Sequence, residues 1–173
     1  MRSLPPGGWT SRSGRPFATD MTFAEFQPGQ KLVYGPATVS EAEMLAFAHH
    51  YDPQWFHADV ERSASGPWDG LIASGWHTCG IAMRLAVEGA LAGSESFGSP
   101  GLEYLKWLAP VRPADALTLH AEVLGVRRSE RKPWLGVLRW RWRLLNQHDV
   151  AVLELVVTSL FDLGRARESS GAR

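Results

Sequence analysis

Residues 74–92 read SGWHTCGIAMRLAVEGALA, and this stretch decides the fold. As an α-helix it would be roughly 28 Å long, at about 1.5 Å per residue. Its main polar residues are His77, Arg84 and Glu88, whose spacings of seven and four place them on one narrow stripe. Nearly everything else in the stretch is small or apolar. The sequence therefore predicts a long central helix that the rest of the chain largely encloses.

Strands are predicted on the C-terminal side of this helix. The clearest lies at 135–145, where a period of two separates an apolar face from a polar one. The apolar face holds Leu138, Trp140, Trp142 and Leu144, and the other face holds Val137, Arg139, Arg141 and Arg143. Further strands are expected at 101–111, 117–126 and 150–161, with a hairpin connection at 146–149. Several long antiparallel strands after one buried helix predict an α+β domain in which a curved sheet wraps that helix.

The N-terminal side is predicted to begin with a short strand at 31–38 and a helix at 41–50. Ser40 resembles a helix N-cap, and Glu43 completes a capping box. Asp52-Pro53 should end this helix. The following stretch, up to residue 72, is expected to be irregular.

Residues 51–59 read YDPQWFHAD and place a carboxylate, Asp52, five positions before an imidazole, His57. Loops on rigid scaffolds often carry catalytic side chains, and such a pair can move protons near neutral pH. An aspartate before proline is also common in plain turns, and a histidine among aromatic residues is often structural. The spacing alone leaves both interpretations open.

Gly75 is expected in the first turn of the central helix. Backbone N–H groups there lack intrahelical acceptors and lie at the positive end of the helix dipole, so they can stabilise an oxyanion. Glycine also lets a ligand approach the backbone closely. Tight packing of the helix would explain this glycine equally well.

Taken together, these segments resemble the MaoC-like dehydratases, which are related to the R-specific enoyl-CoA hydratases. The resemblance is carried by DPQWFHAD at 52–59, GLIASG at 70–75 and LKWLAPVRPAD at 105–115. It covers residues 23–163 and implies a hotdog fold, in which a sheet wraps a long central helix. It also implies a coenzyme A thioester substrate, no metal or other cofactor, and usually a dimer.

Carried over residue by residue, Asp52 and His57 match the family's catalytic pair. Gly75 matches the glycine whose N–H binds the thioester oxygen, and Asp59 matches a position expected to be structural. The activity this implies is reversible hydration of a 2-enoyl-CoA, or a related acyl thioester, to a 3-hydroxyacyl-CoA. The spacing does not assign acid and base within the pair. Two alternatives are a hotdog acyl-CoA thioesterase and a non-catalytic acyl-CoA-binding protein of the same fold.

The sequence also departs from the family pattern around this site. Gln54 and Trp55 stand where Asn and Pro are usual, Ser74 replaces a common His, and Met83 stands where some hydratases have a serine. The residues expected to contact substrate are Trp55, Phe56, Ser74 and Trp76. If such bulky rings, with Trp68, line the acyl channel, a short, branched or aromatic acyl group should fit better than a long straight chain.

Length and composition indicate a single-domain protein. The 173 residues carry a formal net charge of zero, which gives no reason to expect nucleic acid or an anionic membrane as partner. The single cysteine, Cys79, cannot form an internal disulfide, and no Cys/His spacing fits a zinc site. No apolar stretch could span a bilayer, and we expect a cytoplasmic protein. We expect a flexible leader at 1–21, the hotdog domain at 22–163 and a flexible tail at 164–173.

The strand at 135–145 carries two more expectations. Its apolar face exceeds what one small sheet needs, which predicts a homodimer in which sheets or central helices of two chains pack together. We interpret its arginines as a solvated face, with a coenzyme A phosphate site as the alternative. The basic turn at 127–132 is a second candidate for those phosphates on charge alone.

Overall fold

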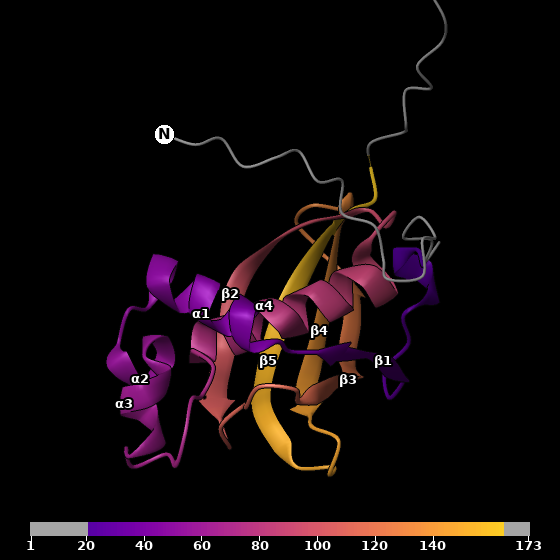
Figure 1. The fold of residues 1–173 in the computed structure, drawn as a ribbon. Helices are drawn as coiled ribbons and strands as arrows, with labels where there is room; N and C mark the ends of the chain where they lie inside the picture. The colour runs from indigo at the N-terminus through magenta and orange to yellow at the C-terminus, as the bar shows by residue number, and fades with distance from the viewer. Residues whose placement is uncertain (1–20, 165–173) are drawn as a thin grey trace, which may run out of the picture.

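The computed structural model describes residues 21–164, and at its centre helix α4 lies across one face of a five-stranded sheet (Figure 1). Helix α4 spans Gly75–Ala86 and continues as a π-helical turn, η2, at Val87–Leu91. The strands are β1 (Lys31–Thr38), β2 (Ser96–Trp107), β3 (Ala116–Arg128), β4 (Leu135–Leu145) and β5 (Ala151–Asp162). Their order is β1-β3-β4-β5-β2, and every neighbouring pair is antiparallel. The predicted α+β hotdog fold is confirmed.

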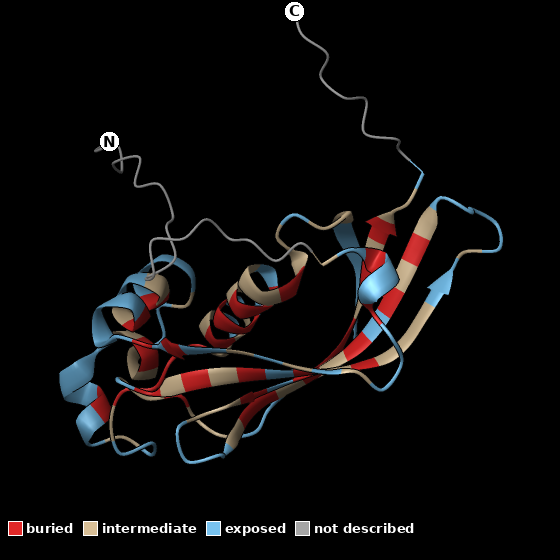
Figure 2. Cartoon of the chain, turned by 90° about the vertical axis from the view of Figure 1, so that its right-hand side faces the viewer, coloured by how far each residue is buried: buried red, intermediate tan, exposed pale blue. Residues whose placement is uncertain are grey.

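Strand β4 shows how the alternating sequence builds the core. The four apolar side chains predicted to share one face are at most 2% exposed. They belong to one hydrophobic core with Ile81 and Leu85 of α4, and Figure 2 shows buried residues gathered where sheet and helix meet. The premise that this face is more apolar than one small sheet needs is wrong, because the core of the same chain covers it. The homodimer expected from it stays a prediction.

The opposite face of β4 is held by ion pairs. Three arginines of this strand meet three glutamates of other strands: Arg139 with Glu103 of β2, Arg141 with Glu122 of β3 at 3.1 Å, and Arg143 with Glu154 of β5 at 3.4 Å. Each pair is partly exposed to solvent. The row therefore has the character of a solvated face, and its charges are balanced within the chain.

The N-terminal helix follows its sequence signals closely. After the short 3₁₀ helix η1 (Phe23–Glu25) and strand β1, helix α1 spans Glu41–Tyr51. The Ser40 hydroxyl accepts from Glu43 N at 3.2 Å, and the Glu43 carboxylate accepts from Ser40 N at 3.0 Å. This is the predicted capping box. Asp52 is the C-cap, so α1 delivers the candidate carboxylate at its end.

The stretch after α1 is more ordered than expected. It contains two short helices, α2 (Trp55–Ala58) and α3 (Val60–Ala64), where an irregular segment was predicted. The side chain of Asp59 accepts from Arg62 N at 3.0 Å and caps α3, in keeping with a structural role. In Figure 1 the three helices α1–α3 gather beside the N-terminal end of α4.

Two further expectations need adjustment. Strand β2 runs from Ser96 to Trp107, so it starts and ends earlier than predicted. Helix α4 is enclosed on one side only, because Trp76 and Met83 are 62% and 45% exposed.

The predicted flexible leader and tail fall almost wholly outside the described residues. Within residues 21–164, no helix is long and apolar enough to cross a membrane.

Candidate active site

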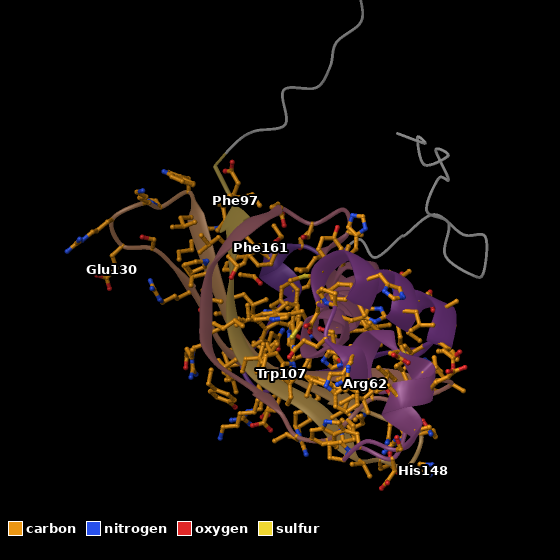
Figure 3. The ribbon with its side chains drawn as sticks, turned by 60° about the vertical axis from the view of Figure 1, so that its left-hand side comes forward. Arg62, Phe97, Trp107, Glu130, His148 and Phe161 are labelled. Carbon is orange, nitrogen blue, oxygen red and sulfur yellow. The ribbon has the colours of Figure 1, made fainter. Side chains whose placement is uncertain are left out.

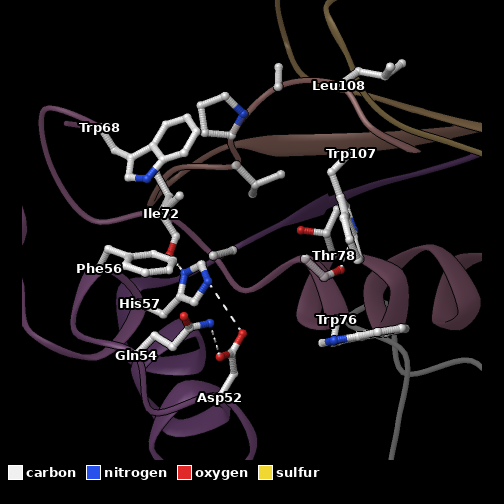
Figure 4. A pocket seen from close by; sticks show the side chains of 15 residues that line it. Asp52, Gln54, Phe56, His57, Trp68, Ile72, Trp76, Thr78, Trp107 and Leu108 are labelled. Atoms are coloured by element: carbon white, nitrogen blue, oxygen red, sulfur yellow. Dashed lines mark hydrogen bonds and ion pairs between the residues drawn. The ribbon is translucent and has the colours of Figure 1, made fainter. Parts of the chain in front are cut away.

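The end of α1 and the short helix α2 bring the predicted pair together. Asp52 caps α1, and His57 lies in the single turn of α2 that follows. Asp52 Oδ2 and His57 Nε2 are 3.5 Å apart, and His57 is only 7% exposed. Figure 4 shows the two side chains pointing toward one another at the floor of a pocket. Two side chains five residues apart in sequence therefore lie at one place in the structure.

A backbone carbonyl fixes the orientation of His57. Its Nδ1 lies 2.9 Å from the carbonyl oxygen of Ile72. Because a carbonyl can only accept, we assign the imidazole proton to Nδ1. The other ring nitrogen, Nε2, is then the one directed at Asp52 and at the pocket. In the neutral ring it carries a lone pair.

Two neutral donors hold the carboxylate of Asp52. The Ser74 hydroxyl donates to Oδ2 at 2.7 Å, and the Gln54 side-chain amide donates to Oδ1 at 2.8 Å. Burial raises the pKa of Asp52, but the hydrogen bonds from Ser74 and Gln54, with the neighbouring His57, outweigh burial and leave this pKa below its usual value. Asp52 is accordingly ionised at neutral pH.

Gly75 begins α4 beside this carboxylate and packs tightly against Trp107. The Trp107 indole Nε1 donates to the Gly75 carbonyl at 3.0 Å, and a Cβ added to Gly75 would overlap the indole ring. The tight-packing interpretation of this glycine thus has direct support. Gly75 also lines the pocket in the first turn of α4, where N–H groups lack intrahelical acceptors. The two interpretations are compatible.

The pocket itself has a volume of about 390 Å³. Asp52, His57 and Gln54 form its polar floor, and aromatic and apolar side chains form its walls. These walls come from Phe56, Trp68, Ile72, Ala73, Trp76, Thr78 and residues 107–111. Such a mixture of a few polar groups in an apolar cleft is typical of small-molecule sites.

The residues expected to contact substrate separate into two groups. Phe56 and Trp76 line the pocket, whereas Trp55 and Ser74 do not. The Trp55 ring lies against Gly66 and under the Arg62 guanidinium, 4.7 Å from the ring centre. Ser74 instead contacts Asp52.

Sequence reasoning missed the wall formed by residues 107–111. These residues come from the end of β2 and the segment after it, some 50 residues beyond Asp52 and His57. The only available signal was that the segment 105–115 is one of the three family-like motifs.

The basic turn at 127–132 is not near this pocket. Strands β3 and β4 meet there, at the end of the sheet where Leu135 pairs with Asp162. Trp107 at the pocket pairs with Leu153, toward the other end of β5. Figure 3 shows Glu130 of the turn and Trp107 well separated. Among residues 21–164, no three His, Cys, Asp or Glu side chains are grouped so as to hold a metal ion.

A family model described as "MaoC like domain" matches residues 24–136. The protein YdeM of Bacillus subtilis is 31% identical over 134 residues, which are 78% of this chain and 94% of YdeM. The 3-hydroxyacyl-thioester dehydratase Z of Mycobacterium tuberculosis is 31% identical over 91 residues, which are 51% of this chain and 60% of that protein.

Among solved structures, the crystal structure of the MaoC-like dehydratase from Rhodospirillum rubrum is similar with a TM-score of 0.74 and 32% identity. The similarity covers 80% of this chain and 94% of that one. The family match spans the segments 52–59, 70–75 and 105–115 that carry the resemblance.

Proposed function

Because this chain belongs to the MaoC-like domain family, we propose that it catalyses the reversible hydration of a 2-enoyl thioester, with coenzyme A as the expected carrier. The product is the corresponding 3-hydroxyacyl thioester. The similarity to a 3-hydroxyacyl-thioester dehydratase supports this reaction class. The proposal extends the dehydratase-type chemistry of the family to this chain's own residues.

One observation carries the proposal. Asp52 Oδ2 and His57 Nε2 face each other at 3.5 Å on the floor of a pocket whose edge is the first turn of α4. Both atoms can accept a hydrogen bond, because Asp52 is ionised and the His57 proton is on Nδ1. A pair of acceptors beside the Gly75 N–H in the first turn of α4 suits the addition of water to an activated acyl group.

The proton transfers of the reaction follow from the positions of Asp52 and His57. A substrate water can donate one O–H to Asp52 and the other to His57 Nε2, which leaves its oxygen directed at the β-carbon. As the C–O bond forms, Nε2 takes one water proton, and electrons move through the enoyl group onto the thioester oxygen. Nε2 then returns that proton to the α-carbon. One water is added in total, and His57 ends neutral.

The remaining charge is on the thioester oxygen during the reaction. We propose that Gly75 N–H donates to this oxygen at the positive end of α4. The Trp107 indole packs on Gly75 and donates a hydrogen bond to the Gly75 carbonyl, which keeps the first turn of α4 in place.

The proposal is tested with a panel of enoyl-CoA thioesters of varied length, branching and aromaticity. Hydration removes the absorbance of the conjugated enoyl thioester without releasing thiol. Release of free thiol from saturated acyl-CoA, with no hydration, would instead establish a thioesterase. Binding of the panel with neither reaction would establish a non-catalytic acyl-CoA-binding protein.

We further propose a homodimer built on the open side of α4. Trp76, Met83 and Val87 of the helical segment α4–η2 are exposed, as are Leu102 and Trp107 of β2. Leu102 and Trp107 pair with core residues of β5, so they belong to the sheet face that α4 covers. Strand β2 is an edge of the sheet. A second copy covering this apolar strip would lie directly beside the pocket.

A further inference from the structure

Ser74 has a role that neither its sequence position nor the family resemblance assigns. We infer that Ser74 is a positioning residue, whose buried hydroxyl aims the Asp52 carboxylate at the pocket and ties it to the start of α4. It does so through the 2.7 Å hydrogen bond from its Oγ to Asp52 Oδ2. The inference rests on the proposed hydration chemistry only for its kinetic consequence.

The hydroxyl proton of Ser74 has one recipient. Because an ionised carboxylate can only accept, the short Ser74–Asp52 contact commits the Ser74 proton to Oδ2. Ser74 Oγ itself accepts from Trp76 N at 3.3 Å, as an N-cap does. The Ser74 carbonyl accepts from both Thr78 N and Thr78 Oγ1, at 3.0 and 3.2 Å. These bonds engage the hydroxyl proton, the Oγ and the carbonyl oxygen of Ser74.

The burial of Ser74 also indicates that it acts through Asp52. Ser74 is only 1% exposed and does not line the pocket. A side chain so enclosed, with its hydroxyl proton engaged, is poorly placed to bind substrate. Its hydroxyl proton reaches the chemistry through the orientation and charge of the carboxylate.

The Ser74–Asp52 hydrogen bond connects the end of α1 to the start of α4. Asp52 is the C-cap of α1, Ser74 is the N-cap of α4, and Gly75 is the next residue. One hydroxyl therefore sets the carboxylate that holds the water relative to the helix end proposed to bind the thioester oxygen. The distance between these two groups has to match the substrate from β-carbon to oxygen.

The second donor, Gln54, is a weaker constraint. Its amide donates to Asp52 Oδ1 at 2.8 Å, but its side chain is exposed to solvent. Both bonds lower the pKa of Asp52, against the opposing effect of burial. Removing the Ser74 bond should therefore raise the pKa of Asp52 and leave the carboxylate free to rotate.

The experiment compares Ser74→Ala, Ser74→Thr and Ser40→Ala with the wild type. Ser40 is the matched control, because it is also an N-cap serine but donates to no catalytic group. The pKa of Asp52 is measured by NMR titration of its carboxyl carbon, and kcat/KM for an enoyl-CoA is measured against pH.

We expect Ser74→Ala to raise the pKa of Asp52 by roughly one to two units, the equivalent of one charge-assisted hydrogen bond. Asp52 works as an anion, so activity fails as pH falls through its pKa, and the acid limb should move up by the same amount. Ser74→Thr should restore both values, and Ser40→Ala should change neither while lowering Tm about as much as Ser74→Ala.

An unchanged Asp52 pKa in folded Ser74→Ala would overturn the inference. If that variant does not fold, the near-isosteric Ser74→Cys, a weaker donor, is titrated instead, and an unchanged pKa there overturns it equally. A raised pKa in a protein that hydrates no enoyl thioester would contradict the proposed function and leave the positioning role supported.

Discussion

The polar floor of the pocket and its aromatic rim differ in how firmly the rest of the chain holds them. Asp52 and His57 of the floor are largely enclosed, and hydrogen bonds from the buried Ser74 hydroxyl and to the Ile72 carbonyl orient them. Trp68 and Trp76 of the rim are 44% and 62% exposed. The rim is held mainly by ring contacts, such as the edge-to-face pair that Trp76 forms with Trp107.

This difference assigns separate duties to the two regions. A floor whose side chains are oriented by hydrogen bonds has one geometry, which suits chemistry that needs reacting groups within fractions of an ångström. A half-exposed rim can change with the ligand or with a second copy of the chain, which suits selection and assembly. Substitutions in the floor should therefore change rate, and substitutions in the rim should change which substrate or partner is accepted.

The floor should show the largest effects. We expect Asp52→Asn and His57→Ala each to lower kcat by about 10²–10⁴, the usual contribution of a positioned acid–base group, with little change in Tm. Steady-state hydration of the best enoyl-CoA measures this. Asp59→Asn is the control, because Asp59 only caps α3 and asparagine caps equally well. Near-full activity in both floor variants would place the chemistry elsewhere.

The exposed strip beside the rim should govern assembly. Leu102→Glu places a charge on the apolar side of edge strand β2 and should raise the dimer dissociation constant by about 100-fold or more. Sedimentation at micromolar concentration measures the change. Val33→Glu is the matched control, because Val33 is an exposed valine on the other edge strand, β1. A monomeric wild type, or equal loss in both variants, contradicts the proposed interface.

Gly75 lies between the polar floor and the aromatic rim, so its substitution tests how tightly the two regions pack. Gly75→Ala forces the Trp107 ring to move and should cost about 1–3 kcal/mol of unfolding free energy. Gly80→Ala, in the same helix but with open space at its Cβ position, should instead stabilise by about 0.5–1 kcal/mol. Urea unfolding gives both values. If Gly75→Ala is as stable as Gly80→Ala, the packing of Trp107 on Gly75 is not tight.

The rim alone should give the smallest effect. Trp68→Ala removes a wall of the pocket and should raise kcat/KM for a twelve-carbon enoyl-CoA by about 10-fold relative to a four-carbon one. Trp55→Ala removes the same ring from the same region but from outside the pocket, so it should not change this ratio. Efficient turnover of the twelve-carbon substrate by the wild type would argue against a shortened channel.

Local signals in the sequence predicted the fold well. The alternation in β4 and the capping box of α1 depend on residues a few positions apart, and the structure has both. The apolar length of α4 was also read correctly. The exposure of α4 was not predicted. A helix that is apolar on all sides indicates burial, but the pattern does not say whether the same chain or another one covers it.

The site was harder to predict, because its decisive contacts are distant in sequence. Ser74 and Asp52 are 22 residues apart, and Trp107 and Gly75 are 32 apart. No spacing rule reports such contacts. Trp55 and Trp68 illustrate the same limit, since only the path of the loop decides that one packs under Arg62 and the other faces the pocket.

The docking of α1 on α4 has a consequence for how the protein loses function. The two helices meet through the Ser74–Asp52 bond and the stacked rings of Phe47 and His77, 4.9 Å apart. The sheet, by contrast, is a continuous ladder of backbone pairs. A partial opening that releases residues 41–64 would dissolve the site and leave the sheet intact. Activity should then disappear at lower denaturant than strand structure, so that inactivation reports this local unfolding rather than loss of the whole fold.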